Sequence, residues 1–327
     1  MAKQGYIISI FGTKGGVGKS IISLNLGIDI ARETGSQVAL IDLDLSLNGD
    51  LEMLLGMTSS KSLAELIPLL DSIDGSMLRS FLSTHSSGLT LIPALRDHRE
   101  ISLITEKVSR QFLSLCARTF DYTVIDCGSS FTPVSMATLD CSNLILLISQ
   151  ADFLSLHQTV KTLSYLRIHH FPKEKIEVIL NNVHPKIKKD DRTINSTLRR
   201  PVLELLPSSP DTVGTSIIRR EPFVLSAPRS LLSRKVGEVT LQCLKKLPKL
   251  PNIDFRISRT EVASPTAVDT RPHMDAATDS DTKKLQVSER EDLINQIKKS
   301  IHESLIDRLD LRKLDVETGS DPEKAKR

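Results

Sequence analysis

A glycine-rich segment at residues 12–20, GTKGGVGKS, constrains the fold of this 327-residue chain more than any other feature. It follows a short apolar run at residues 6–11 and opens a stretch at residues 19–33 in which Ile and Leu recur at helical spacing. Because glycine lacks a Cβ, backbone N–H groups in such a loop can close around an anion, and the N-terminus of the next helix adds partial positive charge. The segment therefore predicts a strand, a loop and a helix that bind phosphate groups.

The positions of this loop have separate expected roles. Lys19 is placed to reach the β- and γ-phosphates of a nucleotide, and the Ser20 hydroxyl is placed to ligate Mg²⁺. The strict P-loop pattern has glycine where this chain has Thr13, and Lys14 supplies a second lysine at the front of the loop. The residues expected to contact the nucleotide here are Lys14, Gly15, Gly16, Val17, Gly18, Lys19, Ser20 and Ile21.

Apolar runs alternate with helical patterns over the first 249 residues. Helical spacing is present at residues 103–118, 155–168 and 228–246. Near-continuous apolar strands that alternate with helices are typical of a parallel sheet covered on both faces. We therefore expect an α/β fold, with a doubly wound, mostly parallel sheet, over residues 1–249. The expected strands are residues 6–11, 37–42, 89–92, 122–126, 144–149 and 176–180.

The segment KGGVGKS, residues 14–20, resembles the deviant Walker A motif of the MinD/ParA superfamily of P-loop ATPases. The resemblance extends over most of residues 5–247. It implies binding of ATP and Mg²⁺, slow ATP hydrolysis, and a homodimer that forms around two ATP molecules. In that superfamily the extra lysine, here Lys14, crosses the dimer interface to the nucleotide of the partner subunit, so Lys14 is expected to act in catalysis.

Acidic residues end two of the expected strands. Asp42 and Asp44 lie in IDLDLSLNGDL, residues 41–51, and Asp126 ends the run YTVID. Carboxylates at such positions can hold Mg²⁺ through water and can orient an attacking water. By resemblance, Asp44 is the hydrolysis-linked aspartate, Asp42 is a supporting acid and Asp126 has Walker B character. The expected metal site comprises Ser20, Asp42 and Asp126.

Two later segments resemble the part of the superfamily that holds the adenine base. Asn181 stands near the end of the strand-like run VILNNV, with Asn182 as the alternative, and an asparagine in this place pairs with the adenine edge in the superfamily. Residues 205–225 resemble the proline-led adenine loop and the helix after it. The resemblance assigns Pro207 as the anchor of that loop.

Several segments between residues 41 and 230 resemble one branch, the CpaE/TadZ proteins of Tad (Flp) pilus assembly. In that branch the second acidic motif continues toward Gly-Asp-Leu, which here is Gly49, Asp50 and Leu51. The branch often carries an N-terminal receiver-like domain, whereas this sequence starts directly at the ATPase. The resemblance implies a switch that localises or assembles a pilus or secretion machine.

The composition changes after residue 249. Residues 250–287 are rich in Pro, Ser, Thr and Asp and are expected to form a linker. Residues 288–316 then show one apolar stripe at helical spacing, and residues 317–327 are expected to be disordered. Residues 293–315 resemble the N-terminal helical segment of CpaF/TadA secretion ATPases, which implies docking to such an ATPase. Self-association or packing on the domain is an equal alternative for this helix.

Two other functions of the superfamily stay open, and so does a non-enzymatic pseudo-ATPase scaffold. A ParA-type partitioning ATPase that binds DNA non-specifically is supported by basic residues, although Asp190 and Asp191 interrupt their first cluster, and nucleic acid is the less favoured partner. A MinD-like ATPase would contact membrane through the C-terminal helix, but that helix mixes acidic and basic residues on its polar face. The basic residues in question are Lys186, Lys188, Lys189, Arg192, Arg199, Arg200, Arg219 and Arg220.

The four cysteines are scattered, and no histidine cluster completes a zinc site with them. We expect buried, reduced thiols in a cytoplasmic protein. No apolar stretch approaches the roughly 18 residues that a membrane span needs. Any membrane contact is therefore expected to be peripheral, at the inner face of the membrane or the cell pole.

Overall fold

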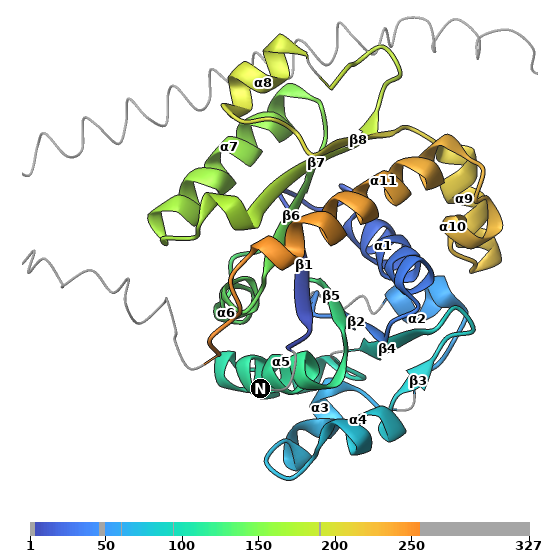
Figure 1. The fold of residues 1–327 in the computed structure, drawn as a ribbon, viewed down its shortest axis with the longest axis vertical. Coiled ribbons are helices and arrows are strands. Elements are labelled where there is room, and N and C mark those ends of the chain that lie inside the picture. The colour runs from blue at the N-terminus through green and yellow to red at the C-terminus, as the bar shows by residue number, and fades with distance from the viewer. Residues whose placement is uncertain (1–3, 46–49, 60, 94, 190, 256–327) are drawn as a thin grey trace, which may run out of the picture. The chain divides into compact units, whose positions relative to one another are not determined.

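In the part of the chain that the structure describes, one sheet carries helices on both faces (Figure 1). The computed structural model describes residues 4–45, 50–59, 61–93, 95–189 and 191–255. The strand order in the eight-stranded sheet is β3-β4-β2-β5-β1-β6-β7-β8, and all neighbours run parallel except β3 and β4. The strands are β1 (Tyr6–Gly12), β2 (Val38–Asp42), β3 (Ser83–Thr84), β4 (Leu89–Pro93), β5 (Tyr122–Asp126), β6 (Leu144–Ser149), β7 (Ile176–Val183) and β8 (Glu204–Pro207).

The expected α/β architecture is confirmed. Each of the six expected strands is present, within three residues of its expected end. The short strands β3 and β8, at the two edges of the sheet, were not expected. The helices are α1 (Lys19–Thr34), α2 (Asp50–Leu55), α3 (Leu63–Leu66), α4 (Gly75–Phe81), α5 (Glu106–Thr119), α6 (Pro133–Asp140), α7 (Phe153–Ile168), α8 (Arg192–Leu198), α9 (Pro210–Arg219), α10 (Phe223–Ser226) and α11 (Leu231–Lys246).

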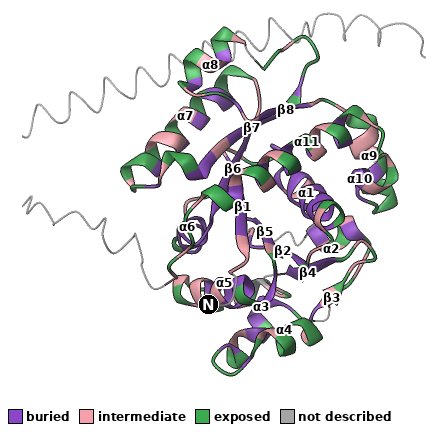
Figure 2. Cartoon of the chain, in the orientation of Figure 1, coloured by how far each residue is buried: buried purple, intermediate pink, exposed green. Residues whose placement is uncertain are grey.

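Alternate residues of the central strand β1 feed two apolar layers. Ile8 and Ile10 join the layer beneath α1, α2, α10 and α11, whereas Ile7 and Phe11 join the layer beneath α3 to α8. This alternation follows from the two-residue period of a strand. The strands are therefore buried on both sides, and the helices keep their exposed residues outward (Figure 2).

The sheet has its topological switch point at β1, since β1 pairs with β5 on one side and with β6 on the other. In open α/β sheets, ligands bind outside the carboxyl ends of the strands at such a point. The glycine-rich loop leaves β1 at this edge. The fold thus places the loop where a ligand site is expected.

The packed domain extends past residue 249. Asn143 donates to the carbonyl of Pro251 at 3.1 Å, Gln4 donates to the carbonyl of Ile253 at 3.1 Å, and Phe255 packs against the apolar core. The rest of the expected linker from residue 256, the helix at 288–316 and the end at 317–327 lie outside the described residues.

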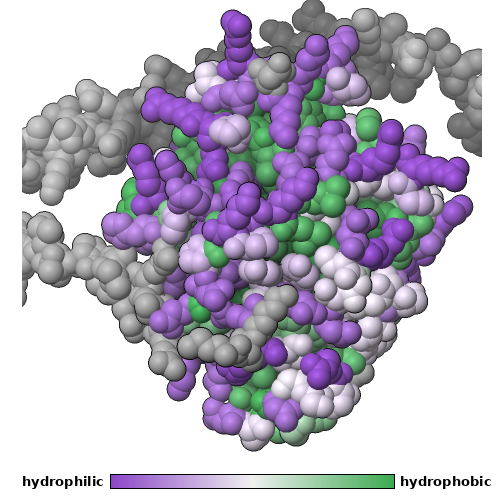
Figure 3. Space-filling view, viewed as in Figure 1, coloured by the Kyte–Doolittle hydropathy of each residue, from purple (hydrophilic) through white to green (hydrophobic). Residues whose placement is uncertain are grey.

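The face shown in Figure 3 is mostly polar, and the cysteines lie inside the fold. Hydrophilic side chains cover most of the face in Figure 3, with apolar side chains in scattered groups. All four cysteines are buried free thiols, as expected. Within the described ranges, no helix is both long and apolar enough to cross a membrane.

Candidate nucleotide-binding site

The loop between β1 and α1 has the shape of an anion-binding turn. Gly16 and Gly18 have φ values of 74° and 91°, in the left-handed region that favours glycine. Gly18 caps α1 without a side-chain hydrogen bond, and the first turn of the helix carries no acidic residue. The first N–H groups of α1 therefore keep their capacity to bind an anion, and the helix dipole favours negative charge there.

Lys19 lies across the base of this loop. Its side chain is buried, with 7% of the residue exposed, and a Cβ at Gly12 would lie 2.5 Å from its Cδ. Its Nζ is 3.9 Å from Oδ2 of Asp44. A buried ammonium group with one distant carboxylate partner retains donors for phosphate oxygens.

Two carboxylates approach the loop from neighbouring strands. Asp42 and Asp126 stand opposite each other in the register of β2 and β5, and 5% and 1% of these residues are exposed. Burial raises the pKa of Asp126, although a hydrogen bond from Ser20 and the charge of Lys19 oppose the rise. Oδ1 of Asp126 is buried and has no hydrogen-bond partner. A buried carboxylate oxygen without a partner fits a hydrated Mg²⁺ at this place, because carboxylates are the usual protein contacts of that ion.

Asp44 lies two residues beyond Asp42, just after the end of β2. Its N–H donates to Oδ1 of Asp42 at 3.3 Å. A Cβ at Gly128 would lie 3.0 Å from the Asp44 carboxylate, and Gly128 has a φ of 70°. Glycine favours this positive φ, and a larger residue would crowd the Asp44 carboxylate, so the segment after β5 lies close against the Asp44 side chain.

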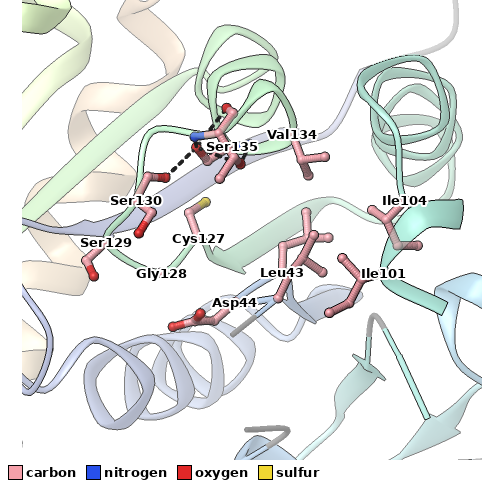
Figure 4. Close-up of a pocket in the computed structure, with 12 residues that line it drawn as sticks. Leu43, Asp44, Ile101, Ile104, Cys127, Gly128, Ser129, Ser130, Val134 and Ser135 are labelled. Atoms are coloured by element: carbon pink, nitrogen blue, oxygen red, sulfur yellow. Dashed lines mark hydrogen bonds between the residues drawn. The ribbon is translucent and has the colours of Figure 1, made fainter. Parts of the chain in front are cut away.

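A pocket of about 420 Å³ opens beside Asp44 (Figure 4). Cys127, Gly128 and Ser130 line one side, and Leu43 and Ile101 line the other. Ser135 donates to the carbonyl of Ser130 at 2.7 Å and so ties this segment to the first turn of α6. The pocket leaves space next to Asp44 for a water or for a residue of another chain.

Lys14 is paired with a residue outside this group. Its Nζ is 3.5 Å from Oδ2 of Asp152, and about one third of its side chain is exposed. Asp152 caps α7 through the N–H of Ser155 at 2.9 Å, and hydrogen bonds from Ser155 together with the charge of Lys14 lower its pKa. Sequence reasoning missed Asp152, although the spacing Asp152-x-x-Ser155 is a helix-capping signal that could have marked it.

The adenine residues expected from the sequence are near one another along the sheet. Pro207 ends β8 and pairs with Val183 of β7, two residues beyond Asn181. The Asn181 side chain, however, contacts the glycine loop: its Nδ2 donates to the carbonyl of Val17 at 2.8 Å. Ile21 is half-buried on α1, and the Val17 side chain is buried in the apolar core.

Comparisons with known proteins agree with this arrangement. The sequence matches the AAA_31 family, described as an AAA domain, over residues 5–210. The chain belongs to this family. It is also 24% identical over 232 residues to the putative septum site-determining protein MinD of Guillardia theta, which covers 69% of this chain and 83% of that protein.

Solved structures show the same type of P-loop ATPase fold. A ParA family ATPase from Chlorobium tepidum TLS superposes with a TM-score of 0.68 at 26% identity, over 73% of this chain and 99% of that one. The septum site-determining protein MinD from Pyrococcus horikoshii OT3, solved with Mg-ADP, superposes with a TM-score of 0.61 at 19% identity, over 73% and 95%. The resemblance to MinD/ParA P-loop ATPases is therefore confirmed, at the level of the superfamily.

Proposed function

We propose that this chain is an ATP-dependent dimeric switch that hydrolyses ATP slowly and places or assembles a larger machine. The proposal rests on the buried Lys19 and Asp126 below the glycine loop, with the half-buried Asp44 beside Lys19 and one Asp126 oxygen unpaired. Bound Mg²⁺ would supply positive charge to the phosphates. Catalysis of phosphoryl transfer rests on positioning and electrostatics of this kind.

Each residue has a role in this proposal. Lys19 and the loop N–H groups neutralise phosphate charge. Ser20 would hold Mg²⁺ directly, and Asp126, with support from Asp42, would hold it through water. Asp44 orients the attacking water in the pocket that it lines.

The proposal assigns Lys14 to the partner subunit's nucleotide. In the single chain Lys14 is paired with Asp152, an exposed pair of the kind that contributes little stability. Lys14 can therefore leave Asp152 at small cost when a second subunit brings a triphosphate. Dimer formation and ATP binding are coupled through this exchange.

The decisive experiment is light scattering coupled to gel filtration, with Mg-ATP, with Mg-ADP and without nucleotide. We expect a dimer with Mg-ATP and a monomer otherwise. Lys19→Ala should abolish ATP binding and the dimer together, while Lys161→Ala, an exposed lysine of α7, should change neither. Retained micromolar ATP binding by Lys19→Ala would contradict the site.

For the machine that the switch serves, we propose a Tad/Flp-type pilus or secretion machine. The support is the resemblance of residues 41–51 and the other segments between residues 41 and 230 to CpaE/TadZ proteins, together with the helical pattern at residues 293–315. We place the protein in the cytoplasm, at the inner face of the membrane or the cell pole. Affinity capture with the full chain, compared with a chain ending at Phe255, tests this: a secretion ATPase retained only by the full chain supports it, and its absence from both contradicts it.

A DNA-binding partitioning ATPase is the second candidate, and ion pairing weakens its first basic cluster. Lys189 is 3.5 Å from the buried Glu204, and Arg200 is 3.8 Å from Glu177, so both have internal partners. Arg219 and Arg220 are exposed at the end of α9, which favours this candidate. A filter-binding titration with ATP at two salt concentrations decides, since phosphate contacts give steep salt dependence.

A MinD-like positioning ATPase at a membrane is the third candidate, favoured by the similarity to MinD of Guillardia theta. Flotation with liposomes that contain anionic lipid, with and without ATP, tests it. ATP-dependent flotation that is lost in the chain ending at Phe255 would replace the pilus assignment.

A further inference from the structure

The side chain of Asn181 lies against the glycine loop from the end of β7. Its Nδ2 donates to the carbonyl of Val17 at 2.8 Å, across 164 residues of sequence. A Cβ at Gly18 would lie 2.4 Å from the same nitrogen, so the carboxamide lies directly over Gly18. A backbone carbonyl only accepts hydrogen bonds, and the amide nitrogen of Asn181 is therefore the atom that faces it.

This contact fixes one peptide plane of the loop. The side chain of Val17 is fully buried in the apolar layer beneath α1, so Val17 is held by its side chain and by its carbonyl. In a planar trans peptide the carbonyl of Val17 and the N–H of Gly18 point in opposite directions. Asn181 thus keeps the Gly18 N–H directed away from β7, where it adds to the donors of the loop.

We propose that Asn181 is a positioning residue for the phosphate-binding loop, and that it sets the affinity for the triphosphate whichever base is attached. The inference rests on the proposed function, because it requires that the loop binds a nucleotide. It differs from the adenine-reading role that the family resemblance implies. A residue that reads adenine changes the preference between bases, whereas a residue that orders the loop changes affinity for every triphosphate equally.

The experiment measures binding of Mg-ATP, Mg-GTP and Mg-tripolyphosphate to the full chain by isothermal titration calorimetry. For Asn181→Ala we expect affinity for all three to fall about three- to tenfold, the loss typical of one hydrogen bond, with the ATP-to-GTP ratio unchanged. The KM for ATP should rise by the same factor with kcat unchanged, because the loop holds the phosphates equally before and during the reaction. A purely structural defect would instead lower kcat through a smaller active fraction.

Asn143 provides a matched control. Its Oδ1 accepts from the N–H of Ile7 at 2.8 Å and its Nδ2 donates to the carbonyl of Pro251, so it also joins two distant segments. It lies before β6, at the opposite end of the sheet from the loop. Asn143→Ala should lower the melting temperature and leave all three affinities unchanged.

A second variant keeps the volume of the side chain. Asn181→Asp replaces the donor with an acceptor that faces the Val17 carbonyl, and its affinity for all three ligands should fall further than that of Asn181→Ala. Loss of ATP affinity alone, with tripolyphosphate unchanged, would overturn the proposal in favour of base reading, and unchanged affinities for all three ligands would also overturn it. Failure of the wild-type chain to bind any of the three would overturn the proposed function instead.

Discussion

The charged residues of the candidate site differ in their exposure to solvent. Lys19 and Asp126 are buried, whereas a quarter of the Asp44 side chain is exposed, next to the pocket. A carboxylate that orients water needs access to water, and a carboxylate that holds a cation benefits from burial. The exposure of each residue thus matches its proposed role.

Asp44→Ala should bind ATP normally and hydrolyse it at least about 100-fold more slowly, because positioned proton acceptors contribute 10²–10⁴-fold. The ATP-bound dimer should then accumulate. Single-turnover hydrolysis and gel filtration with Mg-ATP measure both effects. Asp71→Ala, an exposed aspartate near α4, is the control. Wild-type turnover in Asp44→Ala would remove this residue from catalysis.

Asp29 provides a residue-scale prediction about stability and pH. It lies on α1 against α11, and burial raises its pKa, with a hydrogen bond from the Thr240 side chain opposing the rise. The folded state therefore favours the protonated carboxyl. The protonated Asp29 carboxyl therefore contributes to the free energy of unfolding. This stabilisation is fully present below the ordinary pKa of 3.8 and is lost as the pH rises through the folded-state pKa.

Asp29→Asn should consequently stabilise the protein at pH 7, because it removes a buried charge whose Oδ2 has no hydrogen-bond partner. The melting temperature should rise by roughly 2–4 °C at pH 7, as expected for about 1 kcal/mol. The gain should shrink as the pH approaches 4. Scanning calorimetry between pH 4 and pH 7 measures this change in melting temperature, and Glu221→Gln, at an exposed position, is the control. A gain that does not depend on pH would contradict the assignment of the effect to the buried charge of Asp29.

At the scale of elements, hydrophobic periodicity predicted the long strands and helices, whereas an element stabilised by ion pairs was not predicted. The long strands and helices were predicted because their apolar residues recur with a regular period. Strand β8 was not, since it opens with a charged residue, Glu204. In the fold, burial raises the pKa of Glu204, but the N–H of Leu205 and the ammonium groups of Lys189 and Lys235 outweigh that effect and lower it. The distant partners Lys189 and Lys235 cannot be read from a local sequence pattern.

The same limit applies to the site. The loop, Asp42, Asp44 and Asp126 were predicted because each follows an apolar run, and the fold brings these strand ends together. The partners of Lys14 and Asn181 were not predicted, since Asp152 and Val17 lie far from them in sequence or act through the backbone. Side-chain contacts of this kind depend on how the elements pack in the fold, and hydrophobic periodicity carries no information about them.

Helix α7 gives the element-scale prediction. Asp152→Asn keeps an N-cap acceptor for Ser155, because Asn caps helices as well as Asp, but it removes the charge that holds Lys14. We expect an unchanged melting temperature and an ATP-dependent dimer at lower protein concentration. Asp191→Asn, at the N-cap of α8, is the matched control. Analytical ultracentrifugation at several protein concentrations measures the strength of the dimer. A weaker dimer would show that Asp152 supports dimer formation, rather than competing with the partner's nucleotide for Lys14.

At the scale of the whole molecule, the position of Lys14 raises the question of which subunit it serves. Within one chain Lys14 pairs with Asp152 at the start of α7, whereas Lys19 is the lysine that lies 3.9 Å from Asp44. If Lys14 acts on the partner's nucleotide, a symmetric dimer holds two sites, each built from both chains. A site then needs Asp44 from one chain and Lys14 from the other.

Mixing two inactive variants tests this arrangement. In a heterodimer of Lys14→Ala and Asp44→Ala, the Lys14→Ala chain keeps its own Asp44 and receives Lys14 from its partner, so one of the two sites is intact. Random mixing makes about half of the dimers mixed, and ATPase activity should recover to roughly a quarter of the wild-type value. If Lys14 served its own chain, neither site of the mixed dimer would hold both residues, and the mixture would stay as inactive as each variant alone. Adding Lys19→Ala to the Lys14→Ala chain should abolish the recovery, because the intact site is the one that this chain's Lys19 builds.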